Sequence, residues 1–315
     1  MNQESGLVLR WRLLSALIII SVLLGFICLD YWHPWGAPTG LWLLPLLLLV
    51  TGLATSEALG LLRANDLQPV PWAVYGGTLM VVLGSAIPIL YEWTGSAYPV
   101  DCPFGQLGWP TVMTGLALIV LFVSEMLRYE QPGRVIMHVA SGLLVIVYVG
   151  LLVSFLVALR RFSDHQWGMV ALISVVAVVK VSDSGAYFIG RSCGRHKLAP
   201  TLSPKKTVEG ALGGLVFGSL AALVYFYWLV PLIFGLEQGT PSGLDIGCWI
   251  LYGLILSVAG MIGDLAESMW KRDSQQKDSS RWLPGLGGAL DVLDSLLVAG
   301  LPAYLCWALG LVGPV

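Results

Sequence analysis

Long apolar runs separated by short polar breaks dominate the chain. A bilayer core about 30 Å thick is crossed by roughly 20 residues of α-helix. The breaks carry the proline, glycine and aromatic residues that are typical of turns and membrane interfaces. The pattern therefore predicts the all-α fold class and a polytopic integral membrane protein with about nine transmembrane helices. We expect these spans at residues 13–30, 40–62, 71–92, 109–127, 135–159, 167–189, 211–234, 246–269 and 290–311.

The first apolar segment follows two arginines, Arg10 and Arg12, as the apolar part of a signal peptide would. Its apolar stretch is long, however, and no small-residue cleavage site follows at Cys28–Trp32. We therefore expect this segment to be retained as the first span.

Composition supports the membrane assignment. Hydrophobic residues make up 57% of the chain and charged residues 11%, whereas a soluble domain carries roughly 25% charged residues. The net charge of −2 gives no general attraction to nucleic acid, so we expect no nucleic-acid partner.

The placement of the basic residues predicts the orientation, because short cytoplasmic loops are rich in Lys and Arg. With the N-terminus inside, all but three of the 17 Lys and Arg residues lie on the cytoplasmic side. The exceptions are Lys180, inside a span, and Arg160 and Arg161, on the outside. We expect a multi-pass protein of the inner (cytoplasmic) membrane with its active site on the cytoplasmic side.

The character of the chain changes near residue 165. Residues 1–164 are nearly all apolar helix, which predicts a structural or dimerisation role for these N-terminal transmembrane helices. Residues 165–315 carry charges inside their helices and two long basic loops. We expect this second region to be catalytic and to pack with the first as one unit.

Ionisable residues inside a span are costly to bury and are functional candidates by default. Lys180 and Asp183 are three residues apart on one helix, so they either simply neutralise each other or bring Asp183 into a polar site. Residues 203–207 (Ser-Pro-Lys-Lys-Thr) place hydroxyl and ammonium groups where we expect the next helix to start, a position that suits phosphate. Basic residues near the cytoplasmic face also serve topology and attraction to anionic lipids.

Two further clusters contain paired acids. Residues 264–271 form one stripe of a helix, which either stabilises that helix or forms part of a site; its members are Asp264, Glu267, Ser268 and Lys271. A glycine-rich turn leads to Asp291 and Asp294, again three residues apart. Acids at a helix start are consistent with capping alone. Together with Asp264 they also form the oxygen-rich ligand set that holds Mg²⁺ alongside substrate phosphates.

The ordered set Ser-x-x-Lys-Arg, Lys-Asp and Pro-Gly-x-Gly-Gly-x-x-Asp-x-x-Asp, from Ser268 to Asp294, resembles the signature of the phosphatidate cytidylyltransferase family. Residues 203–210 and 183–187 also match that family, and the resemblance covers roughly residues 165–310. Two positions depart from the pattern: Leu286 stands where the family usually has histidine, and Val292 where it usually has arginine.

The resemblance implies that the chain transfers a cytidylyl group from CTP to phosphatidate, giving CDP-diacylglycerol and pyrophosphate. It implies a Mg²⁺-dependent site, with room for a second cation such as K⁺, in a homodimer surrounded by membrane lipid. We expect the catalytic residues to be Asp264, Asp291, Lys205, Lys206 and Lys271. We expect Mg²⁺ to be held by Asp264, Asp291 and Asp294. The expected substrate-binding residues are Asp183, Ser203, Pro204, Thr207, Glu209, Ser268, Arg272, Lys277, Asp278, Gly287 and Gly288.

Two other functions remain open at this point. Another CTP-using membrane enzyme, such as a polyprenol or phytol kinase, would carry a distantly similar sequence. An ion-coupled transporter would also use intramembrane carboxylates, but it favours inverted repeats and a site at the membrane midplane. Neither of the soluble nucleotide-binding patterns GxxxxGK[ST] and GxGxxG is present in the sequence.

Overall fold

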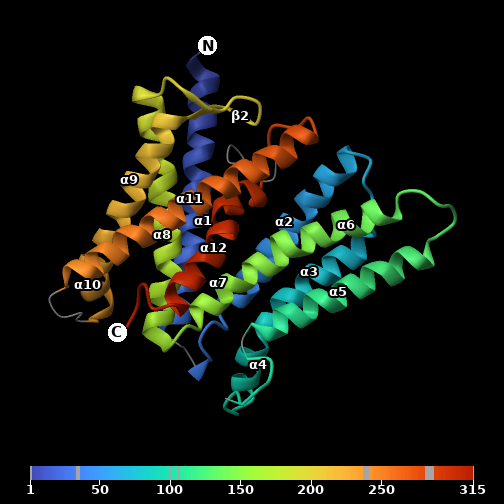
Figure 1. Cartoon of the computed structure of the whole chain (residues 1–315), viewed down its shortest axis with the longest axis horizontal. Helices are drawn as coiled ribbons and strands as arrows, with labels where there is room; N and C mark the ends of the chain where they lie inside the picture. The colour runs from blue at the N-terminus through green and yellow to red at the C-terminus, as the bar shows by residue number, and fades with distance from the viewer. Residues whose placement is uncertain are drawn as a thin grey trace. The chain divides into compact units, whose positions relative to one another are not determined.

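The computed structural model consists almost entirely of α-helices (Figure 1). It describes residues 2–32, 36–99, 101–105, 107–236, 241–280 and 287–314, with side chains in the first helix described from residue 15 onward.

The elements follow one another along the chain with short connections. In order they are α1 (Asn2–Trp32), α2 (Leu44–Ala64), α3 (Pro71–Ser85), α4 (Ile87–Trp93), α5 (Gly108–Leu127), α6 (Val135–Val145), the π-helical turn η2 (Ile146–Leu151), α7 (Leu152–Arg160), α8 (His165–Cys193), β1 (Lys197–Ala199), β2 (Ser203–Thr207), α9 (Val208–Val224), the π-helical turn η3 (Tyr225–Leu229), α10 (Val230–Phe234), α11 (Gly243–Asp273) and α12 (Ala289–Ala308).

The predicted membrane spans are confirmed. Within the described residues, eight helical segments are long and apolar enough to cross a bilayer. They run Ser15–Trp32, Leu44–Ala64, Gly108–Leu127, Val135–Arg160, His165–Cys193, Val208–Phe234, Gly243–Asp273 and Ala289–Ala308. Each overlaps one span expected from the hydrophobic pattern.

The expected third span, residues 71–92, is not one straight helix. It is divided into α3 and α4, which meet at an angle of 56° and together bring the number of candidate spans to nine. Pro88 lies in the first turn of α4. Proline has no N–H to donate and its ring clashes with the preceding turn, so a straight helix cannot continue through this position.

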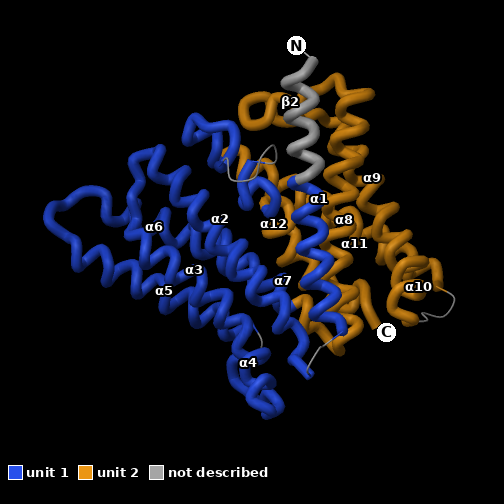
Figure 2. Tube along the Cα trace, turned by 180° about the vertical axis from the view of Figure 1, so that it is seen from behind, with its two compact units in different colours: residues 1–158, 270–293 blue, residues 159–269, 294–315 orange. Residues whose placement is uncertain are grey.

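The chain forms two compact units (Figure 2). Unit 1 contains Met1–Ala158 and Trp270–Leu293, and unit 2 contains Leu159–Met269 and Asp294–Val315. The first break lies near the expected change at residue 165, but residues 270–293 return to the N-terminal unit. The assignment of a structural role to residues 1–164 and a catalytic role to residues 165–315 stays a prediction.

In unit 1, helices α2, α3, α5 and α6 pack through small residues. A Cβ added to Gly150 would lie 3.1 Å from the carbonyl oxygen of Thr78. The Thr55 hydroxyl lies 3.2 Å from that of Thr78 and links α2 to α3. Close packing and hydroxyl hydrogen bonds are what hold helices together in lipid, where the hydrophobic effect does not bring apolar surfaces together.

In unit 2, α9 packs along α8 and α11 (Figure 1), again at glycines. A Cβ on Gly213 would lie 2.6 Å from the Ile189 side chain, and one on Gly253 would lie 2.5 Å from the Ser219 Cα. A Cβ on Gly263 would lie 2.3 Å from the carbonyl oxygen of Asp294, so α11 and α12 touch backbone to backbone there. This contact lies beside Asp264 and brings the charged residues of the two helices together.

The expected position of residues 203–207 at the start of a helix is corrected by the structure. These residues form β2, which pairs antiparallel with β1, and α9 begins only at Val208. Pro204 is tolerated because β2 is an edge strand, where a missing N–H costs little. Thr207 then caps α9, its hydroxyl accepting a hydrogen bond from the Gly210 N–H at 3.1 Å.

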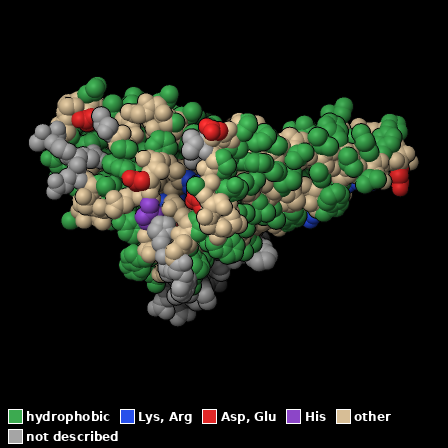
Figure 3. All heavy atoms as spheres, turned by 90° about the horizontal axis from the view of Figure 1, so that it is seen from below, with side chains coloured by type: hydrophobic (Ala, Val, Ile, Leu, Met, Phe, Trp, Pro, Cys, Tyr) green, Lys and Arg blue, Asp and Glu red, His purple; other side chains and the backbone are tan. Residues whose placement is uncertain are grey.

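Apolar side chains lie on the outside of the protein. Leu17 is 63% exposed, and many other large hydrophobic residues are likewise exposed. Hydrophobic side chains cover much of the face shown in Figure 3. Water does not tolerate an apolar surface of this extent, whereas lipid does.

Arg160, an exception to the charge rule for orientation, is buried in unit 2. Its guanidinium donates a hydrogen bond to the His165 carbonyl oxygen at 3.0 Å and lies 2.9 Å from the His165 Nδ1. Arg160 closes the turn between α7 and α8. This structural role explains why a basic residue lies on the side of the membrane where the distribution of Lys and Arg does not predict one.

Candidate functional site

The first polar cluster lies in unit 2 and joins two of the sequence motifs. Lys206, on β2, places its ammonium 2.7 Å from Oδ2 of Asp264, on α11. The Ser268 hydroxyl, one turn further along α11, lies 3.4 Å from the other oxygen of that carboxylate. The Asp264 side chain is 38% exposed, so a ligand can reach it.

The same cluster includes the predicted pair on α8. Lys180 and Asp183 lie 3.6 Å apart and are both partly exposed. Asp183 also interacts with the Ser295 side chain and with the charges of Asp264 and Lys206. The pair is therefore part of a wider network, and not only a local neutralisation on one helix.

Asp294, on α12, completes the cluster. It is buried, accepts a hydrogen bond from the Ser295 hydroxyl at 3.0 Å, and interacts electrostatically with Asp264 and Lys180. The cluster then holds three carboxylates and two ammonium groups, which leaves an excess of one negative charge. An excess charge that is partly shielded from water is unfavourable until a cation approaches it.

The chemistry of this donor set fits a hard divalent cation. Carboxylate oxygens are the ligands that Mg²⁺ prefers, and the ion is usually held by one or two of them together with substrate phosphates. Among the described residues, no three His, Cys, Asp or Glu side chains converge into a ready-made metal cage.

The second polar cluster lies in unit 1 and centres on Asp291. The Lys271 ammonium, at the end of α11, lies 2.6 Å from Asp291 Oδ1, and both side chains are 12% exposed. Oδ2 of Asp291 accepts hydrogen bonds from the Gly288 N–H at 2.7 Å, from the Ser279 N–H at 3.0 Å and from the Ser279 hydroxyl at 2.6 Å. Both carboxylate oxygens are therefore held in place.

The two predicted glycines are required by their surroundings. Gly287 has φ +92°, which side-chain-bearing residues rarely adopt, and a Cβ there would lie 2.5 Å from Asp291 Oδ2. A Cβ on Gly288 would lie 2.2 Å from both the Glu57 Oε2 and the Ser279 hydroxyl. Gly287 and Gly288 thus let the backbone pass close to the carboxylates of Asp291 and Glu57.

Glu57 is a residue of this cluster that the sequence reasoning missed. It is buried on α2, and its carboxylate accepts hydrogen bonds from the Ala289 and Leu290 N–H groups at 2.9 and 2.8 Å. The signal was present in the sequence, because Glu57 is the one acidic residue of the span Leu44–Ala64. Ionisable residues inside a span are functional candidates, and this applies to Glu57 as it does to Asp183 and Asp264.

Comparison with known proteins identifies the family of the chain. Residues 10–309 match the cytidylyltransferase family. This chain belongs to that family.

Several curated members of the family are named phosphatidate cytidylyltransferase. The protein of Brucella suis is 33% identical over 251 residues, which cover 76% of this chain and 87% of that one. The protein of Staphylococcus haemolyticus is 38% identical over 161 residues, which cover 51% of this chain and 56% of that one. A Staphylococcus aureus protein is 37% identical over 163 residues, with the same shares covered.

Other residues expected from the cytidylyltransferase motifs have structural partners. Glu209 accepts hydrogen bonds from the N–H groups of Arg195 and His196 and thereby closes the β1–β2 hairpin onto α9. Arg272 donates a hydrogen bond to the Gln276 carbonyl oxygen at 3.2 Å, at the end of α11. These contacts stabilise the two loops, and they leave the substrate-binding role of both residues as a prediction.

The remaining expected residues lie on the two loops. On β2, Ser203 is partly buried, and Pro204 and Lys205 are exposed. Lys277 and Asp278 are exposed after α11. Of the two departures from the family pattern, Val292 lies on α12 and Leu286 lies outside the described residues.

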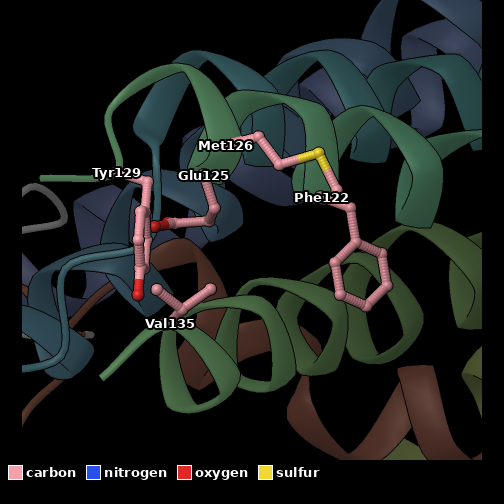
Figure 4. Close-up of a pocket in the computed structure, with 5 residues that line it drawn as sticks. All are labelled: Phe122, Glu125, Met126, Tyr129 and Val135. Carbon is pink, nitrogen blue, oxygen red and sulfur yellow. The ribbon is translucent and has the colours of Figure 1, made fainter. Parts of the chain in front are cut away.

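A shallow groove elsewhere in unit 1 carries none of the residues expected from the cytidylyltransferase motifs. It measures about 350 Å³ and is lined by Phe122, Glu125, Met126, Tyr129 and Val135 (Figure 4). Its polar residue, Glu125, is already paired with Arg128, whose guanidinium Nε lies 2.9 Å from the carboxylate. The groove is therefore mainly apolar, and the carboxylate of Glu125 in it already has a partner in Arg128.

Proposed function

We propose that this chain transfers a cytidylyl group from CTP to phosphatidate, giving CDP-diacylglycerol and pyrophosphate. The observation that carries the proposal is the ion pair between Lys206 and Asp264, which joins two motifs 58 residues apart in a member of the cytidylyltransferase family. The curated relatives named above support the choice of phosphatidate as the acceptor.

In this reaction an oxygen of the lipid phosphate attacks the α-phosphorus of CTP. The new P–O bond forms as the bond to the β-phosphate oxygen breaks, and pyrophosphate leaves. Two anions must meet, so catalysis depends mainly on positioning and on charge neutralisation. The lipid phosphate is already ionised near neutral pH, and no general base is needed.

The carboxylates of the unit 2 cluster are suited to a divalent cation. Asp264 and Asp294 would hold Mg²⁺, with Asp183 contributing negative charge nearby. The bound ion would neutralise charge on the triphosphate. Lys206, beside Asp264, would offer its ammonium to a phosphate of the substrate. The motif adds Asp291 to the metal ligands and leaves room for a second cation such as K⁺, and both assignments stay predictions.

Lys271 and Asp291 act as a pair in unit 1. The carboxylate fixes the ammonium at 2.6 Å, so the lysine is held ready for an anionic ligand without a large loss of side-chain freedom on binding. Lys205, exposed on β2, would make an additional contact with phosphate. Ser203, Pro204, Thr207, Ser268, Lys277 and Asp278 would shape the loops around the nucleotide.

The apolar helices support a membrane setting for the reaction. The acceptor is a lipid, and a protein with this many apolar helices resides where that lipid is found. We place the protein in the inner membrane with its active site on the cytoplasmic side, where CTP is available, and we propose that it works as a homodimer.

The proposal is tested with the purified full-length protein in detergent, supplied with Mg²⁺ and CTP labelled at the α-phosphate. Phosphatidate should yield labelled CDP-diacylglycerol together with an equal amount of pyrophosphate. A parallel reaction with a polyprenol or phytol and with CTP labelled at the γ-phosphate, the group that a kinase transfers, should give no labelled prenyl phosphate. Prenol phosphorylation without CDP-diacylglycerol would overturn the proposal in favour of a CTP-dependent kinase.

A further inference from the structure

Glu57 lies at the centre of a hydrogen-bond network that reaches the proposed catalytic residues of unit 1. Its Oε1 accepts from the Ser280 hydroxyl at 2.7 Å and the Ala289 N–H at 2.9 Å. Its Oε2 accepts from the Leu290 N–H at 2.8 Å and lies 3.0 Å from the Ser279 hydroxyl. One carboxylate thus binds the segment after α11 and the first turn of α12.

The contacts to α12 are those of a helix cap supplied from another helix. The first N–H groups of a helix have no partner within it, and a carboxylate both accepts their hydrogen bonds and is favoured by the helix dipole. Glu57 serves the N–H groups of Ala289 and Leu290. Asp291 serves the N–H of Gly288, immediately before the helix.

Ser279 connects the two carboxylates. Its hydroxyl lies 3.0 Å from Glu57 Oε2 and 2.6 Å from Asp291 Oδ2, and its N–H donates to Asp291. Asp291 in turn holds the Lys271 ammonium. A displacement of the carboxylate at residue 57 therefore reaches Asp291 through Ser279 and through the first turn of α12, both of which it binds directly.

We infer that Glu57 is a positioning residue for cytidylyl transfer, which sets the placement of Asp291 and Lys271 without touching substrate. This inference rests on the proposed function, because it requires that pair to belong to the transfer machinery. It also explains the third glycine of the Pro-Gly-x-Gly-Gly motif, because a Cβ at Gly288 would lie 2.2 Å from Glu57 Oε2.

The decisive variant is Glu57→Gln, which keeps the shape of the side chain but replaces one acceptor oxygen by an NH₂ group that faces backbone donors. We expect kcat/KM for CTP, expressed per folded protein, to fall about 100-fold, the loss that a misplacement of about 1 Å produces. The matched control is Glu125→Gln, which alters another buried glutamate of unit 1 that is paired with Arg128. This control should keep kcat/KM within about twofold of the unaltered protein.

A double variant separates positioning from simple destabilisation. Ser279→Ala removes the hydroxyl that connects the two carboxylates, and we expect it to lower kcat/KM about tenfold, in line with the loss of a hydrogen bond to a charged group. Because both changes act through Asp291, Glu57→Gln combined with Ser279→Ala should be less than about threefold worse than Glu57→Gln alone, as coupled residues are non-additive. Multiplicative losses would argue against the connection.

Ser280→Ala keeps the inference testable if Glu57→Gln does not fold, because it removes a hydrogen bond to Glu57 Oε1 and leaves the carboxylate in place. We expect it to lower kcat/KM severalfold at unchanged thermal stability.

Two results overturn the inference. One is an unchanged kcat/KM in both Glu57→Gln and Ser280→Ala. The other is a loss of activity in Glu57→Gln that is explained entirely by a smaller amount of folded protein, as would be the case for any loss in Glu125→Gln. An unaltered protein that makes no CDP-diacylglycerol overturns the proposed function instead, so the two failures are distinguishable.

Discussion

The ammonium of Lys206 lies 2.7 Å from the carboxylate of Asp264, which joins the β1–β2 hairpin to the first residue of the charged stripe on α11. A pair of this kind, partly exposed and beside two further carboxylates, can exchange its internal partner for a phosphate and a cation. This pair is the starting point for the predictions below.

Asp264→Asn should lower turnover at least about 100-fold, because removing one preorganised charge from an active site costs on that order. The measurement is CDP-diacylglycerol formation by purified protein with Mg²⁺. The matched control is Asp245→Asn at the other end of α11, where the partly exposed carboxylate accepts hydrogen bonds from the N–H and hydroxyl of Ser242 just before the helix, and asparagine keeps an acceptor oxygen there. Near-normal turnover by Asp264→Asn would remove Asp264 from the site.

Lys206→Met should raise the KM for CTP by about 10- to 100-fold, the value of a hydrogen bond to a charged group. Methionine keeps most of the length of the side chain and removes the ammonium group. Lys197→Met, on the neighbouring strand β1 where the lysine is exposed, should leave KM unchanged. Equal effects of the two substitutions would indicate a general attraction to the basic hairpin and no specific role for Lys206.

Gly263→Ala should destabilise unit 2 by about 1–3 kcal/mol, as overpacking of a close contact does. Its Cβ would lie 2.3 Å from the Asp294 carbonyl oxygen, and backbone cannot move aside as a flexible side chain can. Thermal unfolding in detergent measures the loss, and activity should fall with it because Asp264 and Asp294 are forced apart.

Gly247→Ala, also on α11, is the control for this substitution. A Cβ there meets nothing within 4 Å, so the change should be neutral or stabilising by roughly 0.5–1 kcal/mol through the better helix propensity of alanine. A destabilisation similar to that of Gly263→Ala would show that α11 tolerates no alanine for reasons unrelated to the contact with α12.

Chelation by EDTA should abolish CDP-diacylglycerol formation, and Mg²⁺ added in excess should restore it. The reason is that the unit 2 cluster carries an excess of negative charge, and a triphosphate adds more, so the two repel each other until a divalent cation lies between them. Addition of K⁺ alone should not restore activity. Full turnover in EDTA would contradict a divalent-cation role for Asp264 and Asp294.

The sequence determined the fold class and the membrane spans, because a bilayer imposes a length and an apolar composition that are written directly in the order of residues. It also determined the identity of the charged candidates, since Lys180, Asp183, Asp264 and Asp294 are costly inside a span and stand out for that reason. Pro88 is present in the sequence, but the bend beside it depends on the packing around α3 and α4.

Tertiary structure alone decided which of these charges meet. Lys206 contacts Asp264 because residues 203–207 form a strand of a hairpin and not the first turn of a helix. The pairing of a strand depends on a partner elsewhere in the chain. Glu57 accepts hydrogen bonds from the N–H groups of Ala289 and Leu290, which lie more than 230 residues further along the chain. Contacts over such separations depend on how helices pack, and no local pattern of residues encodes them.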